Sequence, residues 1–384
     1  MRDGRRATKL ALALAALALA VSSRAGLWDT KADAARQEKT LGQTGKNVKV
    51  LTDLPESQTF LVMNYISASL GVRCDYCHVN EGGDKWVWES DAKPEKLTAR
   101  RMMQMQMDIN RGNKDILGTS GVAVTCFTCH RGQTKPANSP VLPISITQAQ
   151  LDAGTAKKPA PAETLPTVEQ ILDKYVAALG GRAAVEKLKM RVTTGKQVIW
   201  NGTEFPFETY QKAPNKSLDV TTRPNNVVVN VGFDGTAAWL QGPRGIRDLG
   251  GAQLAQAARD ADFYSDLHLR ELYPEMAVAG REKVGERDAY VIVSRVSEKR
   301  IERLYFDAQT GLLLRIAATT ETPLARLPEE TVFEDYREVD GVKIPFTVRV
   351  SYVDPFIGWT RKLTEVKHNV TIEDSKFDKP APKK

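Results

Sequence analysis

Apolar residues recur at helical spacing in two stretches of the first third of the chain. The first covers residues 60–70 and stops at Gly71, and its apolar stripe is Val62, Ile66 and Leu70. The second covers residues 94–110, ends near Gly112, and has the stripe Ala99, Met102, Met105 and Ile109. Apolar residues three or four positions apart share one face of an α-helix, and glycine commonly ends one. We therefore expect two helices here.

Beyond residue 166 the pattern changes from helical to strand spacing. Thr167 and Gln170 have the spacing of a capping box, and the helix they open is expected to end at Gly180. Short β-branched and aromatic runs then follow, separated by the turn pairs Asn201-Gly202, Asp234-Gly235 and Asp340-Gly341. We expect about ten strands and one further helical stretch over 252–272. This part is predicted to be an antiparallel α+β domain.

The composition of the chain suggests where these units begin and end. Arg2, Arg5, Arg6 and Lys9 precede an Ala/Leu/Val run, and Ser23-Arg24-Ala25 has small residues suited to cleavage. This is the pattern of a secretory signal peptide. A later segment rich in proline reads as an extended linker. The expected order is signal peptide 1–25, polar and loosely ordered lead-in 26–53, first domain 54–135, linker 136–166, β-rich domain 167–375 and tail 376–384.

All four cysteines of the chain lie in two Cys-x-x-Cys-His motifs of the first domain. They are Cys74, Cys77 and His78, and Cys126, Cys129 and His130. Two thiols three residues apart lie on one side of a helical turn, where they can form thioethers to the vinyl groups of one haem. The adjacent histidine then reaches the iron as its proximal ligand. The sequence therefore predicts two covalently attached haem c groups.

Two other readings of the cysteine pairs fit less well. A structural zinc site could use four cysteines, but it has no need of a histidine after each pair. A thioredoxin-like redox pair would need one motif and a parallel-sheet context, which the pattern does not provide.

The charge of +7 gives little support for nucleic-acid binding. Removal of residues 1–25, which hold five basic residues and one acid, leaves +3. The four propionates of two haems would bring the mature protein near neutrality. We expect no nucleic-acid partner.

The sixth ligand of each iron decides between electron transfer and chemistry on a small molecule. Met63 stands on the first expected helix, eleven residues before Cys74, where it could ligate iron or simply fill a gap in the core. On the second helix the candidates are Met102, Met103 and Met105. Helical spacing alone leaves both choices open.

The first domain resembles the tetrahaem cytochrome subunit of photosynthetic reaction centres. The matching stretches are Met63 with 71–78, residues 99–110, and residues 124–132. In that family a helix before most haems supplies an axial methionine. The resemblance implies Met63 for the first haem and Met102 for the second, with Met105 as the alternative. The family has four haems and this chain has two motifs, so it is similar to one two-haem half.

The β-rich domain resembles the periplasmic outer-membrane lipoprotein-sorting carriers. The matching segments are the helix ending at Gly180-Gly181, residues 208–214, 307–313 and 335–346. That superfamily folds as a half-open antiparallel barrel wrapped on helices, with an apolar cavity. The full expected fold is thus a mainly-α dihaem c-type cytochrome domain followed by an α+β antiparallel half-barrel.

The function expected from these features is electron transfer by an extracytoplasmic, periplasmic cytochrome. Two irons with histidine and methionine ligands are six-coordinate and leave no site for a substrate, so no catalytic residue is expected. The partners would be redox proteins, including a membrane-bound electron-transfer complex, and the second domain would dock a partner or bind a lipid or other apolar ligand. The alternatives are a haem peroxidase or oxidase with one open axial site, and an apolar-ligand carrier with an accessory cytochrome.

Overall fold

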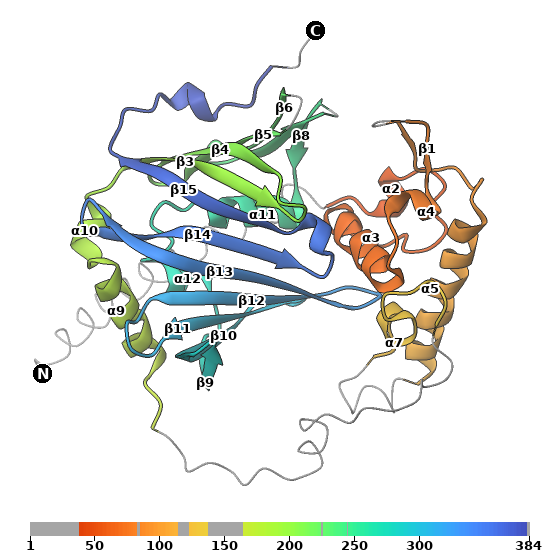
Figure 1. The fold of residues 1–384 in the computed structure, drawn as a ribbon, viewed down its shortest axis with the longest axis horizontal. Coiled ribbons are helices and arrows are strands. Elements are labelled where there is room, and N and C mark those ends of the chain that lie inside the picture. The colour runs from red at the N-terminus through yellow and green to blue at the C-terminus, as the bar shows by residue number, and fades with distance from the viewer. Residues whose placement is uncertain are drawn as a thin grey trace, which may run out of the picture.

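The computed structural model describes residues 38–82, 85–113, 123–136, 164–223, 226–243 and 245–381. A small N-terminal domain, rich in helices, packs beside one end of a large β-sheet domain (Figure 1). The expected signal peptide and residues 137–163 of the expected linker lie outside the described residues. Within the described ranges, no helix combines the length and the apolar character needed to cross a membrane.

The N-terminal domain contains the two helices expected from the apolar stripes. α3 ends at Leu70, and Gly71 caps it in the left-handed conformation with φ of 65°. α5 begins at Pro94, whose fixed φ suits a first helical turn, and ends at Gly112. The elements are α2 (Leu41–Thr44), α3 (Glu56–Leu70), α4 (Cys74–Cys77), β1 (Val79–Asn80), β2 (Trp86–Val87), α5 (Pro94–Gly112) and α7 (Cys126–His130).

Residues 38–53 differ from the loosely ordered lead-in that we expected. They contain α2, and the side chain of Leu51 is 8 % exposed. Leu51 belongs to an apolar cluster that also includes residues of α3. Its burial, and not the polar composition around it, decides the structure of this segment.

The C-terminal domain is one open antiparallel sheet. Its strands run in the order β8-β7-β6-β5-β4-β3-β15-β14-β13-β12-β11-β10-β9, more than the ten or so expected. The three expected turn pairs connect β3 to β4, β6 to β7 and β13 to β14. The strands are β3 (Met190–Ile199), β4 (Glu204–Lys212), β5 (Lys216–Arg223), β6 (Val227–Phe233), β7 (Ala238–Gly242), β8 (Gly245–Leu249), β9 (Ala277–Val284), β10 (Arg287–Ser297), β11 (Arg300–Asp307), β12 (Leu313–Glu321), β13 (Arg326–Val339), β14 (Val342–Tyr352) and β15 (Trp359–His368).

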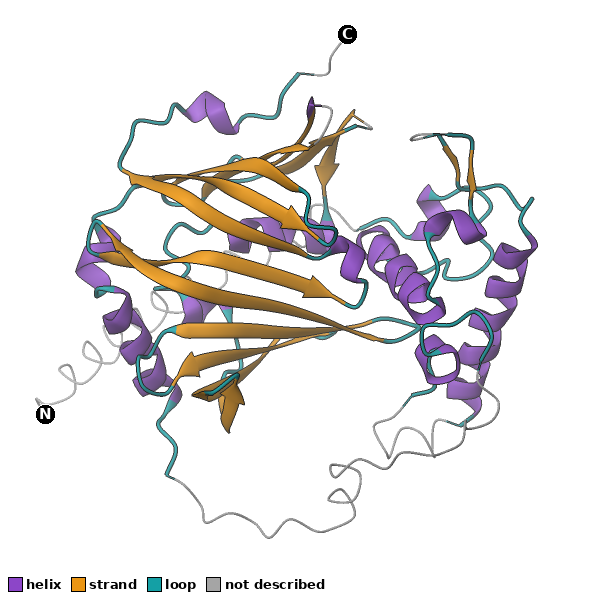
Figure 2. Ribbon diagram, in the orientation of Figure 1, coloured by secondary structure: helices purple, strands orange, loops and turns teal. Residues whose placement is uncertain are grey.

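Helices pack on the sheet and build its core (Figure 2). α9 carries Ile171 and Tyr175 onto Phe306 of β11, and α11 packs on β6 to β8. The helical stretch expected over 252–272 is divided into two helices. Between them lies the buried Phe263, whose main-chain amide donates to the carbonyl of Pro214. The helices are α9 (Val168–Leu179), α10 (Arg182–Glu186), α11 (Gly251–Asp260) and α12 (Leu269–Leu272), with the 3-10 turns η2 (Pro355–Ile357) and η3 (Asp374–Phe377).

The two domains share an apolar cluster, here called the interdomain cluster. The loop between β12 and β13 reaches α3, α5 and α7 (Figure 1). The buried members of the cluster are Leu51, Leu54, Val62 and Tyr65 from the N-terminal domain, and Leu324, Ala325 and Leu327 from the C-terminal domain.

Candidate haem-binding sites

The first motif forms a single helical turn directly after α3. Gly71 reverses the chain, and α4 then carries Cys74 and Cys77 on one turn. The amide of His78 donates to the carbonyl of Cys74 at 2.9 Å, which closes the turn. Because three residues span almost one full turn of helix, the two thiols lie on the same side, as thioether formation requires.

Aromatic side chains surround the histidine of the first motif. The ring of Trp88 meets His78 edge-on at a centroid distance of 5.0 Å, and Trp86 stacks on Trp88 at 4.7 Å. Burial lowers the pKa of His78, and the nearby ammonium of Lys96 lowers it further. The neutral imidazole, which is the form that ligates iron, is therefore favoured.

The loop that carries these tryptophans is fixed to α5 by buried cations. Nζ of Lys96, whose residue is 9 % exposed, donates to the carbonyls of Trp88 and Ser90 at 2.8 Å each. Arg100 pairs with Asp91 at 2.9 Å. The hydrogen bond from Arg100 is the main reason that the pKa of Asp91 lies well below its usual range. Sequence reasoning missed Lys96 and Asp91, because the residues they hold are not at helical spacing from them.

The second motif forms a similar turn with its own cap. Thr125 and Thr128 form a capping box at the start of α7. Nδ1 of His130 lies 3.0 Å from the carbonyl oxygen of Gln133. Because a carbonyl only accepts, Nδ1 must carry the proton, which leaves Nε2 with a lone pair for a metal. This is the arrangement that a proximal histidine needs.

α5 holds the approach to the second motif through a side-chain amide. Nδ2 of Asn110 donates to the carbonyl of Val124 at 2.8 Å, and the amide of Val124 donates back to Oδ1 at 2.9 Å. The buried Gln106 donates to the same carbonyl at 3.0 Å. α5 thus fixes the segment after the first motif and the segment before the second. No local sequence pattern indicates these contacts of α5.

The two motifs meet where their helices end. The amide of Gly132 donates to the carbonyl of Ser69 at 2.9 Å. A Cβ on Gly71 would lie 2.1 Å from the carbonyl oxygen of Gly132, closer than any real contact. The glycine at position 71 is therefore needed for its positive φ and for this close approach.

The methionines of α5 divide between two faces of the helix. Met102 is 42 % exposed and Met105 51 % exposed, whereas Met103 and Met107 pack against the interdomain cluster. Met63 of α3 also packs against that cluster and is partly buried. Met102 and Met105 are thus the methionines of α5 whose side chains are free to meet a further group.

Apolar side chains are exposed around both motifs to an unusual degree. Among the described residues, seven of the eleven large hydrophobic side chains that are exposed lie in the N-terminal domain. Exposed apolar side chains gathered in one region can mark a binding site, and a porphyrin would cover such side chains. The seven are Phe60, Tyr76, Trp88, Leu97, Met102, Met105 and Phe127. Together with the free cysteines and the tautomer of His130, this surface fits two haems.

The pKa values of two of the thiols differ from those of reactive redox cysteines. Burial raises the pKa of Cys126 and of Cys77, whereas reactive redox thiols have a lowered pKa. Within the described part of the chain, which includes all four cysteines, no three His, Cys, Asp or Glu side chains converge as a metal site.

Two of the hollows that the described part of the C-terminal domain contains lie near its surface. One has a volume of about 480 Å³ and lies between β3, β4 and residues 371–376. The other, of about 360 Å³, lies between α9 and β11 and is lined in part by Lys174 and Asp307. The walls of both combine apolar side chains with charged ones, such as Glu373 and Lys376 in the first.

The solved structures similar to this chain include those of three bacterial proteins. A DUF1329 family protein from Desulfovibrio piger is 16% identical, covers 55% of this chain and 97% of its own, and has a TM-score of 0.41. A putative outer membrane lipoprotein-sorting protein domain from Vibrio parahaemolyticus is 12% identical, with coverages of 55% and 97% and a TM-score of 0.40. A LolA superfamily protein from Nitrosomonas europaea is 13% identical, with coverages of 56% and 99% and a TM-score of 0.38. The lipoprotein carriers expected from the sequence are among these matches.

Curated relatives match a short part of the chain. The photosynthetic reaction center cytochrome c subunit of Roseobacter denitrificans is 35% identical over 95 residues, which are 24% of this chain and 25% of that protein. Cytochrome c-554 of Chloroflexus aurantiacus is 32% identical over 117 residues, 28% of this chain and 27% of its own. The chain therefore spans about a quarter of the length of these relatives.

The family model for the photosynthetic reaction centre cytochrome C subunit matches residues 1–203. This range is more than half of the 384 residues and includes both motifs. It also confirms the resemblance that the methionine helices and the paired motifs predict. The chain therefore belongs to the photosynthetic reaction centre cytochrome c subunit family.

Proposed function

We propose that this chain is an extracytoplasmic dihaem c-type cytochrome that transfers electrons between redox partners. The observation that carries the proposal is the geometry of the two Cys-x-x-Cys-His turns. Each places two thiols on one side of a turn, and His130 presents Nε2 outward because the Gln133 carbonyl holds the proton on Nδ1. The exposed apolar side chains around both turns supply the surface for two porphyrins.

Each residue of the sites has a proposed role. Cys74 and Cys77 would bind the first haem, and Cys126 and Cys129 the second. His78 and His130 would be the proximal ligands. The proposed sixth ligands are Met63 for the first haem and Met102 for the second, with Met105 as the alternative. The haem iron, when bound, supplies reversible one-electron chemistry.

The protein's own residues would tune these sites more than react in them. Burial and Lys96 keep His78 neutral, and Trp88 shields its ring from water. Methionine ligation favours the ferrous state and raises the potential. With one histidine and one methionine proposed to hold each haem, no residue of this domain would have a catalytic role.

The location and the partners are proposed on the same basis. Covalent haem attachment takes place outside the cytoplasm, so we propose a periplasmic protein exported by a signal peptide in residues 1–25. Redox proteins would be its partners, and the names of its relatives make a membrane-bound photosynthetic complex one candidate. The C-terminal domain would dock such a partner or bind an apolar ligand.

Haem content and axial ligation test the main proposal. We expect two haems per purified chain by the pyridine haemochrome assay, and none that binds carbon monoxide at neutral pH. Met102→Ala should lower one midpoint potential and open that iron to carbon monoxide. Met103→Ala is the matched control, because Met103 is a neighbouring methionine of α5 that is not a proposed ligand, so its loss should change stability without opening an iron. One haem per chain, or carbon monoxide binding in the unchanged protein, would contradict the proposal and favour a haem enzyme.

Met105→Ala separates the two candidates for the second axial ligand. If Met105 ligates the iron, this variant will bind carbon monoxide and Met102→Ala will not. Both side chains are exposed to a similar degree, so the loss of packing should be matched between the variants. For the C-terminal domain, lipid extracted from protein purified without detergent would support a carrier, and repeated absence of lipid would favour docking.

A further inference from the structure

The loop between β12 and β13 and the first two residues of β13, together residues 322–327, are here called the hairpin tip. It projects from the sheet and ends among the helices of the N-terminal domain (Figure 1). Leu324 is 2 % exposed, Ala325 8 % and Leu327 6 %. Turns between strands normally lie in solvent and are polar. The burial of this apolar tip in another domain therefore indicates that it contributes to the structure of that domain.

The hairpin tip packs among the helices that carry the candidate haem ligands. Its three apolar residues form the interdomain cluster with residues of α3 and of the segment before it. The side chains packed around this cluster include Met63, Met103, Met107 and Cys126. Cys126 is one of the two proposed attachment points of the second haem. The C-terminal domain thus supplies part of the wall behind that motif.

A buried side chain also ties the tip to the second motif. Gln106 is 5 % exposed, and its Nε2 lies 3.0 Å from the carbonyl oxygen of Val124 and 3.2 Å from that of Leu324. One amide group therefore joins α5, the approach to Cys126 and the hairpin tip. Breaking this link would leave the buried carbonyl of Leu324 without its Gln106 donor, which is costly.

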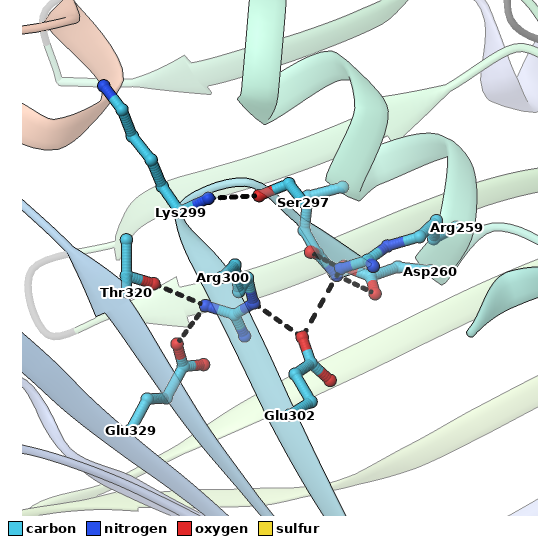
Figure 3. A network of polar contacts seen from close by, with 9 residues as sticks. Arg259, Asp260, Ser297, Lys299, Arg300, Glu302, Thr320 and Glu329 are labelled. Atoms are coloured by element: carbon cyan, nitrogen blue, oxygen red, sulfur yellow. Dashed lines mark hydrogen bonds and ion pairs between the residues drawn. The ribbon is translucent and has the colours of Figure 1, made fainter. Parts of the chain in front are cut away.

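Polar contacts at the base of the hairpin hold it in its direction (Figure 3). Arg300 of β11 contacts Thr320 of β12 at 3.1 Å and Glu329 of β13 at 3.2 Å, so it binds both strands of the hairpin. Its Nε also donates to Glu302 at 2.5 Å, and Glu302 pairs with Arg259 of α11 at 3.7 Å. The hairpin tip is thus the end of two strands that are held together by Arg300 and linked to α11 through Glu302.

We propose that the hairpin tip is a positioning element for the haem at Cys126 and Cys129. It keeps water from the inner side of that site and thereby raises the potential of the haem. The physical reason is that oxidation adds a positive charge, which nearby water stabilises and apolar groups do not. This inference rests on the proposed function, because it requires a haem at the second motif.

The test measures midpoint potentials of the full-length holoprotein. Leu324→Ala should lower the potential of one haem more than that of the other, with two haems retained per chain. Leu324→Met, which conserves the volume, should restore the potential. A variant with alanine at Cys126 and Cys129 would keep only the first haem and so assign the potential that shifts.

Leu304→Ala is the matched control for loss of a buried leucine. Leu304 is 0 % exposed and packs in the core formed by α9 and β11. Its replacement should therefore lower the stability of the C-terminal domain without changing either midpoint potential. If Leu324→Ala does not fold, Gln106→Leu replaces it and should shift the same potential downward. Unchanged potentials in the folded variant would overturn the inference. The haem count of the unaltered protein reports on the proposed function separately.

Discussion

The two domains complete their cores in different ways. The C-terminal domain buries large side chains such as Trp239, Phe306 and Phe377 between its sheet and its own helices and C-terminal segment. The N-terminal domain leaves Phe127 and Met105 more than half exposed. Part of its apolar core is formed by Leu324 of the C-terminal domain. A domain with little apolar core of its own depends on a bound group or on a second domain for stability. The haems are thus expected to be structural as well as functional.

The largest effect should follow from removing the thioether attachments. With Cys74, Cys77, Cys126 and Cys129 all replaced by alanine, we expect the N-terminal domain to lose its fixed structure. The sheet domain has its own core and should remain folded. Limited proteolysis of the full chain should cut between residues 38 and 136 and leave a resistant fragment from about residue 164 onward. The controls are two double variants, one with alanine at Cys74 and Cys77 and one with alanine at Cys126 and Cys129. Each loses one haem and should be cut more slowly than the variant that lacks all four cysteines.

An N-terminal domain that resists protease as well as the unaltered protein would break this comparison. It would mean that the interdomain cluster alone stabilises α3 and α5. In that case the exposed apolar side chains would mark a protein-binding surface instead of a haem site.

A core substitution in the C-terminal domain tests the other side of the comparison. Phe377 is 0 % exposed and packs with Trp239, whose Nε1 donates to the Phe377 carbonyl at 3.3 Å. Phe377→Ala should lower the free energy of unfolding of the sheet domain by about 3 to 5 kcal/mol. Thermal unfolding followed by far-ultraviolet circular dichroism measures this.

Phe356→Ala is the control, because Phe356 is 41 % exposed and should cost far less. The midpoint potentials of the haems should not change in Phe377→Ala. A shift in potential would show that the two domains are coupled beyond the hairpin tip.

The prediction of haem attachment in the N-terminal domain rests on residues that are close together in the sequence. Two thiols and a histidine within five residues predict a haem site without knowledge of the fold. In the same way, the glycine after Leu70 predicts the end of α3. Which methionines of α5 are buried depends on packing against the interdomain cluster, which includes Leu324, far away in the sequence. The resemblance to a known family supplied an order of preference that spacing alone could not.

The C-terminal domain was predictable as a class of fold and no further. Turn pairs such as Asp340-Gly341 located the hairpins, but short strands such as β7 and β8 lack a strong alternating pattern. The contact between Gln106 and Leu324 joins residues 218 positions apart, and no local pattern encodes it. The segment around Leu51 was also missed, because its apolar residues are few and act only through tertiary packing.

A smaller effect is expected from the glycines where the two motifs meet. Both Gly71 and Gly132 have positive φ, at 65° and 81°, so alanine at either position should cost about 1 to 2 kcal/mol. A Cβ on Gly132 would enter open space, whereas on Gly71 it would strike the Gly132 carbonyl. Gly71→Ala should therefore destabilise the N-terminal domain more than Gly132→Ala does. Thermal loss of the native haem spectrum measures the difference, and equal effects would mean that α3 and α7 separate without cost.

The smallest effect is a pH dependence confined to the C-terminal domain. The side chain of His368 is 1 % exposed; its Nε2 accepts from Nε of Arg191 at 3.2 Å, and its Nδ1 lies 2.9 Å from Asp340. Burial lowers the pKa of His368, and the charge of Arg191 also lowers it. Because the folded state favours the neutral ring, stability is complete above the usual histidine pKa of about 6.5 and falls as the pH drops below it. The loss cannot exceed about 1.4 kcal/mol per pH unit for one proton. His368→Gln should remove this part of the pH dependence in urea unfolding followed between pH 7.5 and pH 5, and an unchanged slope would assign it to other groups.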